Sequence, residues 1–356
     1  MKDGWQLVKL NEVCNIINGR NQKLVESPDG EYPIYGSGGI MGYATDYLCE
    51  AGATIIGRKG SINNPIYVET RFWNVDTAFG LLPKPCMNSR LFHYFCLSFD
   101  FTKMNKGTTI PSLVKNDLLQ IDVPYNPSIS EQQRIVGILD AEFEKIDALK
   151  ANAEKNLQNA KDLFQAALKK ELKPKEGWNW MYLPSIAENL DSKRIPITQK
   201  DRTTGTYPYY GASGIVDYVS DYLFDDELLL ISEDGANLLA RSTPIAFSVA
   251  GKIWVNNHAH ILKFKDKATQ KIVEYYIESI TIDDYVTGAA QPKLTQANMN
   301  KIPIPMPPYD DRPGISHRIE TLKSMVITLQ DNYTQTLALC DDLKQALLRK
   351  AFNGEL

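Results

Sequence analysis

A nine-residue phrase occurs twice in this chain, and its repetition restricts the fold more than any other feature of the sequence. Residues 32–40 read YPIYGSGGI and residues 207–215 read YPYYGASGI, so the two copies begin 175 positions apart. The phrase is too long, and too rich in glycine and tyrosine, to recur by an accident of composition. Self-similarity at a fixed spacing is typical of a duplicated structural unit, so we expect one fold to occur twice.

The repeat extends over most of the chain, but the similarity is uneven. Stretches such as 55–70 and 230–245 occupy corresponding places and hardly resemble each other. Shared frames maintain a fold, whereas divergent loops allow two copies to perform different tasks. The shared stretches are, in order, Gly4-Trp5 with Gly177-Trp178, 45–48 with 220–223, 107–113 with 288–294, and 121–124 with 302–305.

Length and composition indicate a globular protein. The chain has 356 residues, of which 43% are hydrophobic and 23% charged, enough for about two or three domains. There is no run of about 18 apolar residues and no charged-then-apolar leader, so we expect neither a membrane span nor a signal peptide. The five cysteines never occur in C-x-x-C spacing, which favours a reduced, cytoplasmic protein without zinc. The net charge of −4 weighs against a simple cationic nucleic-acid binder.

Each copy is predicted to end in a long helix. Residues 130–172 contain no proline and one glycine, and Ser130 with Gln133 forms a plausible capping box. Apolar residues recur at alternating spacings of four and three, the a/d seam of a coiled coil, although two helices packed on their own domains remain an alternative. Helices of about 40 residues would be on the order of 60 Å long. The predicted seam residues are Ile135, Leu139, Ile146, Leu149 and Leu163 in the first copy, and Ile315, Ile319, Leu322, Val326, Leu329 and Leu343 in the second.

The segments before each helix predict a mixed α+β domain. Short alternating or apolar runs such as 54–56, 66–68 and 252–255 predict strands between glycine-rich turns. Residues 90–97 and 270–280 predict helices. The expected order is a first domain over 1–129, a first helix over 130–173, a second domain over 174–309 and a second helix over 310–356.

This order of motifs resembles the specificity (S) subunit of type I DNA restriction-modification enzymes. The resemblance covers essentially the whole chain and depends on the repeated YPIYG-type turn, the tract GTTIPSLVKNDLLQIDVP, the helix EQQRIVGILD and the closing AFNGEL. It implies two target-recognition domains related by a pseudo-two-fold axis and separated by an antiparallel coiled coil of the two helices. Each domain would read one half of a bipartite, asymmetric DNA target, and the helices would set the gap.

The resemblance also implies the partners and the cofactors. A chain of this kind is not an enzyme. Two copies of a methyltransferase subunit, with S-adenosylmethionine, would modify double-stranded DNA, and restriction subunits would use ATP and Mg²⁺ if present. The expected setting is the cytoplasm of a bacterium or archaeon, and the expected role is DNA methylation, either in phage defence or in the regulation of expression. Partner subunits that contact the phosphates would make the net charge of −4 tolerable.

Two loops in each copy carry the residue types that contact DNA. Residues 19–23 and 57–64 combine glycine with Arg, Lys and Asn, which suit phosphates and base edges. The second copy has Glu233 and Asp234 where the first has a basic pair, and carboxylates can accept from cytosine N4. A plain solvated loop is the alternative in each case. The candidate DNA-binding residues are Arg20, Asn21, Lys23, Ser37, Gly38, Arg58, Lys59, Ser61, Asn63, Asn64, Lys106, Thr108, Lys193, Arg194, Ser213, Asn237, Arg241, Asn257, His258 and Lys293.

Two other motifs suggest different functions. His258 and His260 share one strand face, as metal ligands can, but no third ligand is near and the first copy has Thr77 and Phe79 instead. We therefore expect no metal site and no need of these histidines for the fold. Residues 306–309 (MPPY) resemble the [DN]PPY tetrad of amino-methyltransferases, without its Asn or Asp and without a glycine-rich cofactor turn. An autonomous DNA adenine methyltransferase and a DNA-independent adaptor that grips two proteins remain the alternatives.

Overall fold

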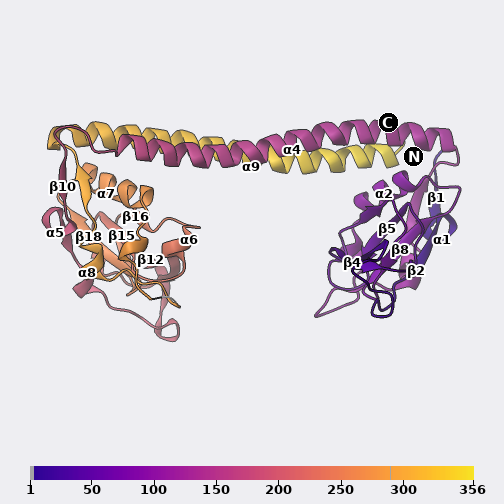
Figure 1. Ribbon diagram of the computed structural model, residues 1–356, viewed down its shortest axis with the longest axis horizontal. Coiled ribbons are helices and arrows are strands. Elements are labelled where there is room, and N and C mark those ends of the chain that lie inside the picture. The colour runs from indigo at the N-terminus through magenta and orange to yellow at the C-terminus, as the bar shows by residue number, and fades with distance from the viewer. Residues whose placement is uncertain (1–3, 289) are drawn as a thin grey trace. The chain divides into compact units, whose positions relative to one another are not determined.

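The computed structural model describes residues 4–288 and 290–356, which form two compact units (Figure 1). Unit 1 comprises Met1–Glu154 with Thr334–Leu356, and unit 2 comprises Lys155–Tyr333. Each unit therefore combines the globular part of one repeat with a part of each long helix. Ala289, in the second copy of the tract that begins at Gly107, lies outside the described residues.

Unit 1 contains two main sheets. A four-stranded antiparallel sheet has the order β2-β8-β5-β6, and a three-stranded sheet has the order β4-β3-β7, in which β3 and β4 form a hairpin and β7 runs parallel to β3. β1 and β9 form a separate antiparallel pair. The strands are β1 Gln6–Lys9, β2 Cys14–Asn18, β3 Tyr32–Gly36, β4 Gly39–Ala44, β5 Ala53–Gly57, β6 Ile66–Val68, β7 Trp73–Asn74, β8 Ala78–Pro83 and β9 Asp122–Tyr125.

Helix α2 (Ser89–Ser98) provides the main apolar cover of unit 1. Its first turn is capped by Asn88, whose side chain accepts hydrogen bonds from the N–H groups of Arg90 and Leu91. Its buried face includes Leu91 and Phe95, which belong to one core with residues of both long helices. The shorter helices are α1 Leu10–Val13, η1 Phe101–Met104 and α3 Lys115–Leu118.

Unit 2 repeats this frame. Its sheets have the orders β11-β18-β15-β16 and β13-β12-β17-β14, and β17 runs parallel to β12 just as β7 runs parallel to β3. β10 pairs with β19 as β1 pairs with β9. The strands are β10 Asn179–Met181, β11 Ala187–Asn189, β12 Thr204–Gly211, β13 Gly214–Val219, β14 Phe224–Asp225, β15 Leu228–Ser232, β16 Ala246–Val249, β17 Lys252–Val255, β18 Ala259–Phe264 and β19 Ile304–Met306.

The helices of unit 2 also follow the first copy. α7 (Lys267–Ser279) takes the place of α2, so both medium-length helices predicted from the sequence are confirmed, with shifts of one to three residues at their ends. The shorter helices are α5 Leu183–Ile186, η2 Asp191–Lys193, η3 Gln199–Asp201, α6 Asn237–Ala240, η4 Asp283–Tyr285, α8 Gln296–Met299 and η5 Tyr309–Asp311. The prediction of one α+β fold present twice is confirmed.

The two long helices, α4 (Ile129–Glu171) and α9 (Arg312–Phe352), pair antiparallel. In unit 1, Lys150 Nζ lies 2.7 Å from Asp341 Oδ1. In unit 2, Arg318 Nη2 lies 3.0 Å from Glu171 Oε2. Later residues of α4 therefore face earlier residues of α9, as an antiparallel coiled coil requires. The core of each unit includes residues from both helices, which argues against helices packed separately on their own domains.

Fewer of the predicted seam positions are buried between the helices than the a/d pattern suggests. Ile135, Leu139 and Ile146 of α4 and Ile315, Ile319 and Val326 of α9 are buried, as predicted. Four other predicted seam residues are exposed: Leu149 (54%), Leu163 (56%), Leu329 (38%) and Leu343 (48%). A pair of helices buries the positions that face the partner helix directly. Positions at the edge of the interface remain in solvent because no third helix covers them.

The predicted cap of the first long helix is wrong by two positions. The helix begins at Ile129, and Ser128 Oγ accepts a hydrogen bond of 3.3 Å from the N–H of Glu131. The cap is therefore Ser128 with Glu131 three residues later, rather than Ser130 with Gln133. Serine followed by glutamate at that spacing is itself a capping-box sequence.

Candidate nucleic-acid interface

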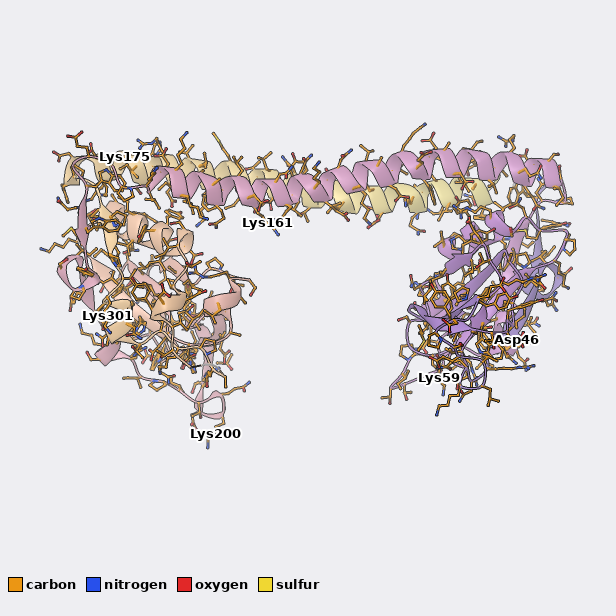
Figure 2. All side chains as sticks on the ribbon, viewed as in Figure 1. Asp46, Lys59, Lys161, Lys175, Lys200 and Lys301 are labelled. Carbon is orange, nitrogen blue, oxygen red and sulfur yellow. The ribbon has the colours of Figure 1, made fainter. Side chains whose placement is uncertain are left out.

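Three segments of unit 1 that are distant in the sequence come together beside the end of β5. They are the turn between β3 and β4, the loop 57–64 and the tract 105–113. The N–H of Gly60 donates to the carbonyl oxygen of Pro111 at 2.9 Å, and the N–H of Leu113 donates to that of Arg58 at 2.9 Å. Figure 2 shows Lys59 toward the end of unit 1 that is remote from the long helices α4 and α9. These segments contain the predicted residues Ser37, Gly38, Arg58, Lys59, Ser61, Asn63, Asn64, Lys106 and Thr108.

Unit 2 builds the same arrangement with the same backbone bonds. The N–H of Gly235 donates to Pro292 O at 3.0 Å, and the N–H of Leu294 donates to Glu233 O at 2.7 Å. The hydroxyl of Ser232 donates to Ala212 O in the turn before β13. These bonds show that Gly60 and Gly235 occupy equivalent positions. Glu233 therefore takes the place of Arg58, and Asp234 takes the place of Lys59.

Glycine is required where the loop of unit 1 leaves β5. A Cβ on Gly57 would lie 2.3 Å from the carbonyl oxygen of Ser61 and 3.0 Å from Cβ of Ser37. Gly60 has a φ of +82°, in the left-handed region that other residues rarely adopt. The loop is therefore tightly closed, and its side chains start from fixed positions.

The side chains of this loop divide into anchors and free groups. Asn63 Oδ1 accepts a hydrogen bond of 2.9 Å from the N–H of Phe101, which ties the loop to η1. Arg58 donates to the carbonyl oxygen of Asp76 at 3.3 Å. Lys59 and Asn64 are exposed. A pocket of about 340 Å³ lies beneath these groups, lined by residues 60–64, Thr102, Asn105 and Pro111.

The segment 19–23 lies against β7 of the three-stranded sheet, where the N–H of Arg20 donates to the carbonyl oxygen of Asn74 at 3.0 Å. The indole N–H of Trp73 donates to the carbonyl oxygen of Arg20 at 3.0 Å, and Asn21 Oδ1 accepts from the N–H of Lys23 at 3.0 Å. The backbone is thus held while the side chains of Arg20 and Lys23 remain exposed. In the tract after η1, Asn105 Oδ1 accepts from the N–H of Gly107 at 2.8 Å, which orders the backbone around Lys106 and Thr108.

In unit 2 the equivalent surface is a network of paired charges. Arg194 Nη1 lies 2.6 Å from Glu233 Oε2, with side chains only 15% and 12% exposed, and Lys293 Nζ lies 3.1 Å from Glu233 Oε1. Burial by itself would raise the pKa of the Glu233 carboxyl, but the hydrogen bonds from Arg194 and Lys293 hold that pKa below its ordinary value. Glu233 is therefore ionised and internally neutralised at neutral pH.

The two histidines of unit 2 have different roles. His260 is 1% exposed; its Nδ1 lies 2.6 Å from Asp191 Oδ2 and its Nε2 lies 2.8 Å from Leu294 O. The expectation that the fold does not need this residue is wrong, because the buried ring of His260 joins η2 to the backbone at Leu294. His258 is 48% exposed and its Nδ1 lies 2.9 Å from Asp234. Among the described residues, no group of three or more His, Cys, Asp or Glu side chains is placed to hold a metal ion.

The remaining predicted residues of unit 2 either are exposed or serve the fold. Arg241 has a φ of 51° at the end of α6, and its guanidinium donates to Ile280 O at 2.9 Å and to Ile277 O at 3.3 Å. Asn237 Oδ1 accepts from the N–H of Thr243 at 3.0 Å. Lys193, Ser213 and Asn257 are exposed. Contact of these six predicted residues, Lys193, Arg194, Ser213, Asn237, Arg241 and Asn257, with DNA stays a prediction.

One exposed feature common to both units was missed from the sequence. The second strand of each hairpin exposes Ile40, Met41 and Tyr43 in unit 1, and Ile215, Val216 and Tyr218 in unit 2. β4 and β13 lie at the edges of their sheets, so both faces of these strands are partly in solvent. The signal was present in the repeated pattern GI-x-x-Y, which places adjacent apolar residues on opposite faces.

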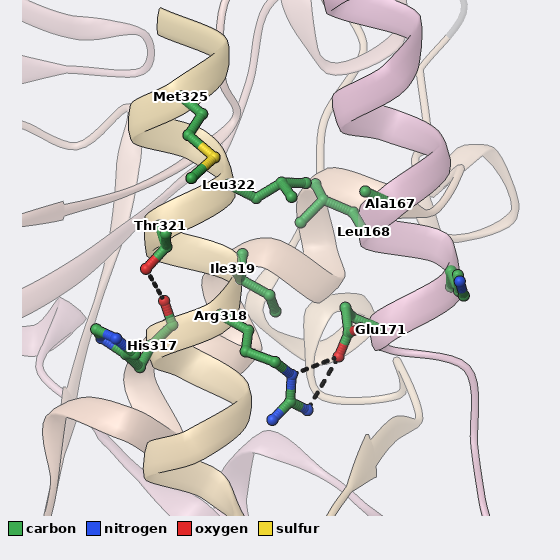
Figure 3. A pocket seen from close by; sticks show the side chains of 10 residues that line it. Ala167, Leu168, Glu171, His317, Arg318, Ile319, Thr321, Leu322 and Met325 are labelled. Atoms are coloured by element: carbon green, nitrogen blue, oxygen red, sulfur yellow. Dashed lines mark hydrogen bonds and ion pairs between the residues drawn. The ribbon is translucent and has the colours of Figure 1, made fainter.

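A second pocket, of about 480 Å³, lies between α4 and α9 in unit 2 (Figure 3). Figure 3 shows Leu168 and Leu322 reaching toward each other across it, with the ion pair of Arg318 and Glu171 at one end. The walls are mainly apolar side chains of the helix pair itself. We therefore describe this pocket as part of the helix packing rather than as part of the nucleic-acid interface.

The tetrad at 306–309 does not form a site of its own. Met306 is buried at the end of β19, where it pairs with Asn179. The chain then continues through two prolines into η5. Within the described residues, no helix is long and apolar enough to span a membrane.

Comparison with known proteins identifies the family behind this duplicated frame. The family model for the type I restriction modification DNA specificity domain matches residues 2–159 and again residues 175–338. The chain therefore belongs to this family, whose members are specificity components rather than catalysts. The two matched regions coincide with the two repeats.

Individual relatives agree with this assignment. The chain is 34% identical over 146 residues to a protein named as a type I restriction enzyme specificity subunit of Haemophilus influenzae, a match that covers 41% of this chain and 37% of that relative. It is 22% identical over 400 aligned positions to the type I restriction enzyme EcoDI specificity subunit of Escherichia coli, covering 99% of this chain and 88% of that protein.

Solved structures share the fold. One chain from a structural study of the assembly and conformational transition of a type I R-M system is 17% identical and superposes with a TM-score of 0.81, covering 100% of this chain and 99% of that one. The HsdS subunit from Thermoanaerobacter tengcongensis is also 17% identical, with a TM-score of 0.58 and coverage of 100% and 98%. The predicted likeness to S subunits is confirmed.

Proposed function

We propose that the chain is the non-catalytic DNA sequence-specificity subunit of a type I restriction-modification methyltransferase complex, and that each unit reads one half of a bipartite, asymmetric target. The observation that supports this most directly is the equivalence of the two loops. Gly60 and Gly235 make the same backbone bond, yet the neighbouring side chains differ in size and charge. One frame that presents two different sets of side chains suits two different half-sites.

In this proposal α4 and α9 set the gap between the half-sites. A helix of 43 residues, such as α4, is about 65 Å long at about 1.5 Å per residue. Half-sites that lie on one face of B-DNA are about 34 Å apart for each helical turn. A stiff antiparallel pair of this length is sufficient to fix such a spacing.

The proposed assembly assigns the chemistry to other chains. A methyltransferase subunit, expected in two copies, would carry S-adenosylmethionine, and restriction subunits would carry ATP and Mg²⁺. This chain would bind no cofactor and would work in the cytoplasm. Its net charge of −4 fits a subunit whose partners provide many of the phosphate contacts. We accordingly expect the isolated chain to bind DNA more weakly than the complex.

Exposed residues of the loop of unit 1 provide the test. Lys59 and Asn64 are changed together to alanine, and Asn63 is left unchanged because it anchors the loop to η1. In cells that carry the system, methylome sequencing should show a relaxed or altered sequence at one half-site, the same sequence at the other and the same gap. The unchanged half-site is the internal control.

Each alternative function makes a prediction of its own, one for an assay of this chain alone and one for the double variant. An autonomous adenine methyltransferase would transfer a labelled methyl group to DNA with this chain alone. An adaptor that does not read DNA would leave both half-sites unchanged in the double variant. Either result would contradict the proposed function.

A further inference from the structure

The two units carry opposite charges at equivalent backbone positions. The residue whose carbonyl accepts from Leu113 in unit 1 is Arg58, and the residue whose carbonyl accepts from Leu294 in unit 2 is Glu233. The residue that follows is Lys59 in one unit and Asp234 in the other. The frame is the same, so the difference lies in the side chains that it presents.

The cations of this surface in unit 1 lack acidic partners. Arg20, Lys23 and Lys59 take part in no ion pair among residues 4–288 and 290–356. Arg58 also forms none within that part of the chain, and its guanidinium carbon lies 6.0 Å from the ring centre of Phe79. Lys106 differs, because its Nζ lies 3.6 Å from Asp117.

The cations of the corresponding surface in unit 2 have such partners. Lys293 and Arg194 both contact Glu233, and the ring of His258 contacts Asp234. Lys193 Nζ lies 3.9 Å from Glu188. Carboxylates of unit 2 therefore partner the charges of Lys193, Arg194 and Lys293 before any ligand approaches.

We propose that the two units hold DNA by different forces. The unpaired cations of unit 1 add a phosphate-directed, salt-dependent part of the affinity to the reading of its half-site, and unit 2 reads the other half-site by hydrogen bonds from an internally neutralised surface. This inference rests on the proposed function, because it takes both surfaces to face DNA.

The physical reason is the release of counterions. Each phosphate that a protein cation neutralises makes the plot of log K against log salt steeper by about 0.9. A lysine that already has a carboxylate partner replaces few counterions, because its charge is balanced within the protein. Unpaired Lys23 and Lys59 should therefore contribute to the slope, and paired Lys193 and Lys293 should not.

The paired surface of unit 2 is suited to reading base edges. Asp234 fixes the ring of His258 through Nδ1, which leaves Nε2 as the available group of a half-exposed side chain. The charges of Glu233 are compensated by Arg194 and Lys293, so the carboxylate does not repel the phosphates as strongly as a free one would. Recognition by such a surface depends on hydrogen-bond geometry and only weakly on salt.

Two double variants of the full chain, each assembled with the methyltransferase subunit, test this difference. Lys23→Gln with Lys59→Gln removes two unpaired charges from unit 1, and Lys193→Gln with Lys293→Gln removes two paired charges from unit 2. Binding is measured by fluorescence anisotropy between about 50 and about 200 mM salt. The probes are a duplex that carries the target found by methylome sequencing and a random duplex of equal length. Circular dichroism and thermal unfolding check that each variant is folded.

We expect the first double variant to reduce the magnitude of the salt slope by about 1.8 and the second to change it by less than about 0.5. Equal reductions, or a larger reduction in the unit 2 variant, would overturn the inference and leave the proposed function intact. A wild-type complex that fails to prefer the target duplex would contradict the proposed function instead.

Lys200 provides a further check within unit 2. It lies in η3, outside the shared frame, and Figure 2 shows it at the tip of the unit. It takes part in no ion pair in the part of the chain that the structure describes. If Lys200→Gln reduced the slope as much as Lys59→Gln, unit 2 would hold phosphates through this loop, and the inference would be wrong.

Discussion

His93 is a buried titratable residue of α2 in unit 1, with its Nδ1 3.4 Å from Thr54 Oγ1. Burial, and then the charge of Arg90, lower the pKa of His93 to about 4. In an unfolded chain the pKa of histidine is about 6.5. Below pH 6.5 the unfolded chain therefore takes up a proton that the folded chain refuses. The free energy of unfolding of unit 1 therefore has its full value above pH 6.5 and falls as the pH drops toward 4. Below pH 4 His93 causes no further loss of stability.

We predict that His93 makes unit 1 less stable by about 2 kcal/mol at pH 5 than at pH 7. His93→Gln should remove this part of the pH dependence, which urea unfolding at the two pH values would measure. His317→Gln is the matched control, since His317 is exposed on α9. If the His93 variant kept the full pH dependence of the wild type, the assignment to this residue would be wrong.

At the scale of residues, the composition of the sequence located the loops that could contact DNA. It could not distinguish basic side chains that are free to contact DNA from those that stabilise the fold. The loop 57–64 was identified from its glycines and basic residues, and the structure brings it together with the two other segments. Arg194 and Arg241 carry the same charge as Arg58 but serve the interior, because Glu233 and the end of α7 lie within their reach. Those partners are about 40 positions away in the sequence, and no local pattern reveals them.

At the scale of elements, the turn that leaves β5 depends on a residue without a side chain. Gly57→Ala would place a Cβ 2.3 Å from the carbonyl oxygen of Ser61, so the backbone of the loop must shift. We expect the free energy of unfolding to fall by about 2 kcal/mol. Gly38→Ala should change it by less than about 0.5 kcal/mol, because a Cβ there meets nothing within 4 Å. Urea unfolding of both variants makes the comparison, and equal values would contradict the tight turn.

The elements themselves were largely predictable from sequence periodicity. The long helices and the strands were recognisable because apolar spacing and glycine-rich turns are local signals. The helix start was misplaced because Ser128 and Ser130 both suit a cap, and only the bond from Glu131 distinguishes them. The burial of the seam was overestimated at Leu149 because exposure depends on how many helices surround a position.

At the scale of the whole molecule, the proposed gap can be altered through both helices together. Ion pairs such as Lys150 with Asp341 define the register of the pair. Deleting 154–160 and 331–337 removes seven residues from each helix at facing positions and keeps that register. The helices become about 10 Å shorter, so we expect a gap about three base pairs shorter with both half-site sequences unchanged.

Methylome sequencing would measure this change as well. Lys155→Ala with Lys161→Ala is the control, because both side chains are exposed on α4 and the helix keeps its length. An unchanged gap in the deletion variant would contradict the proposed role of the helices. Altered bases within the half-sites would contradict it too.

The interleaving of the two repeats has a consequence for biosynthesis. The ring of Phe352, near the end of α9, contacts Trp5 at 6.3 Å and Phe95 at 5.9 Å between ring centres. The globular part of unit 1 is made before Phe352, so it lacks a piece of its own interior until translation reaches that residue. Its aromatic surface stays open to chaperones or to aggregation for that interval. A premature stop before the codon of Phe352 would therefore damage unit 1, whose globular part is made well before that codon is read.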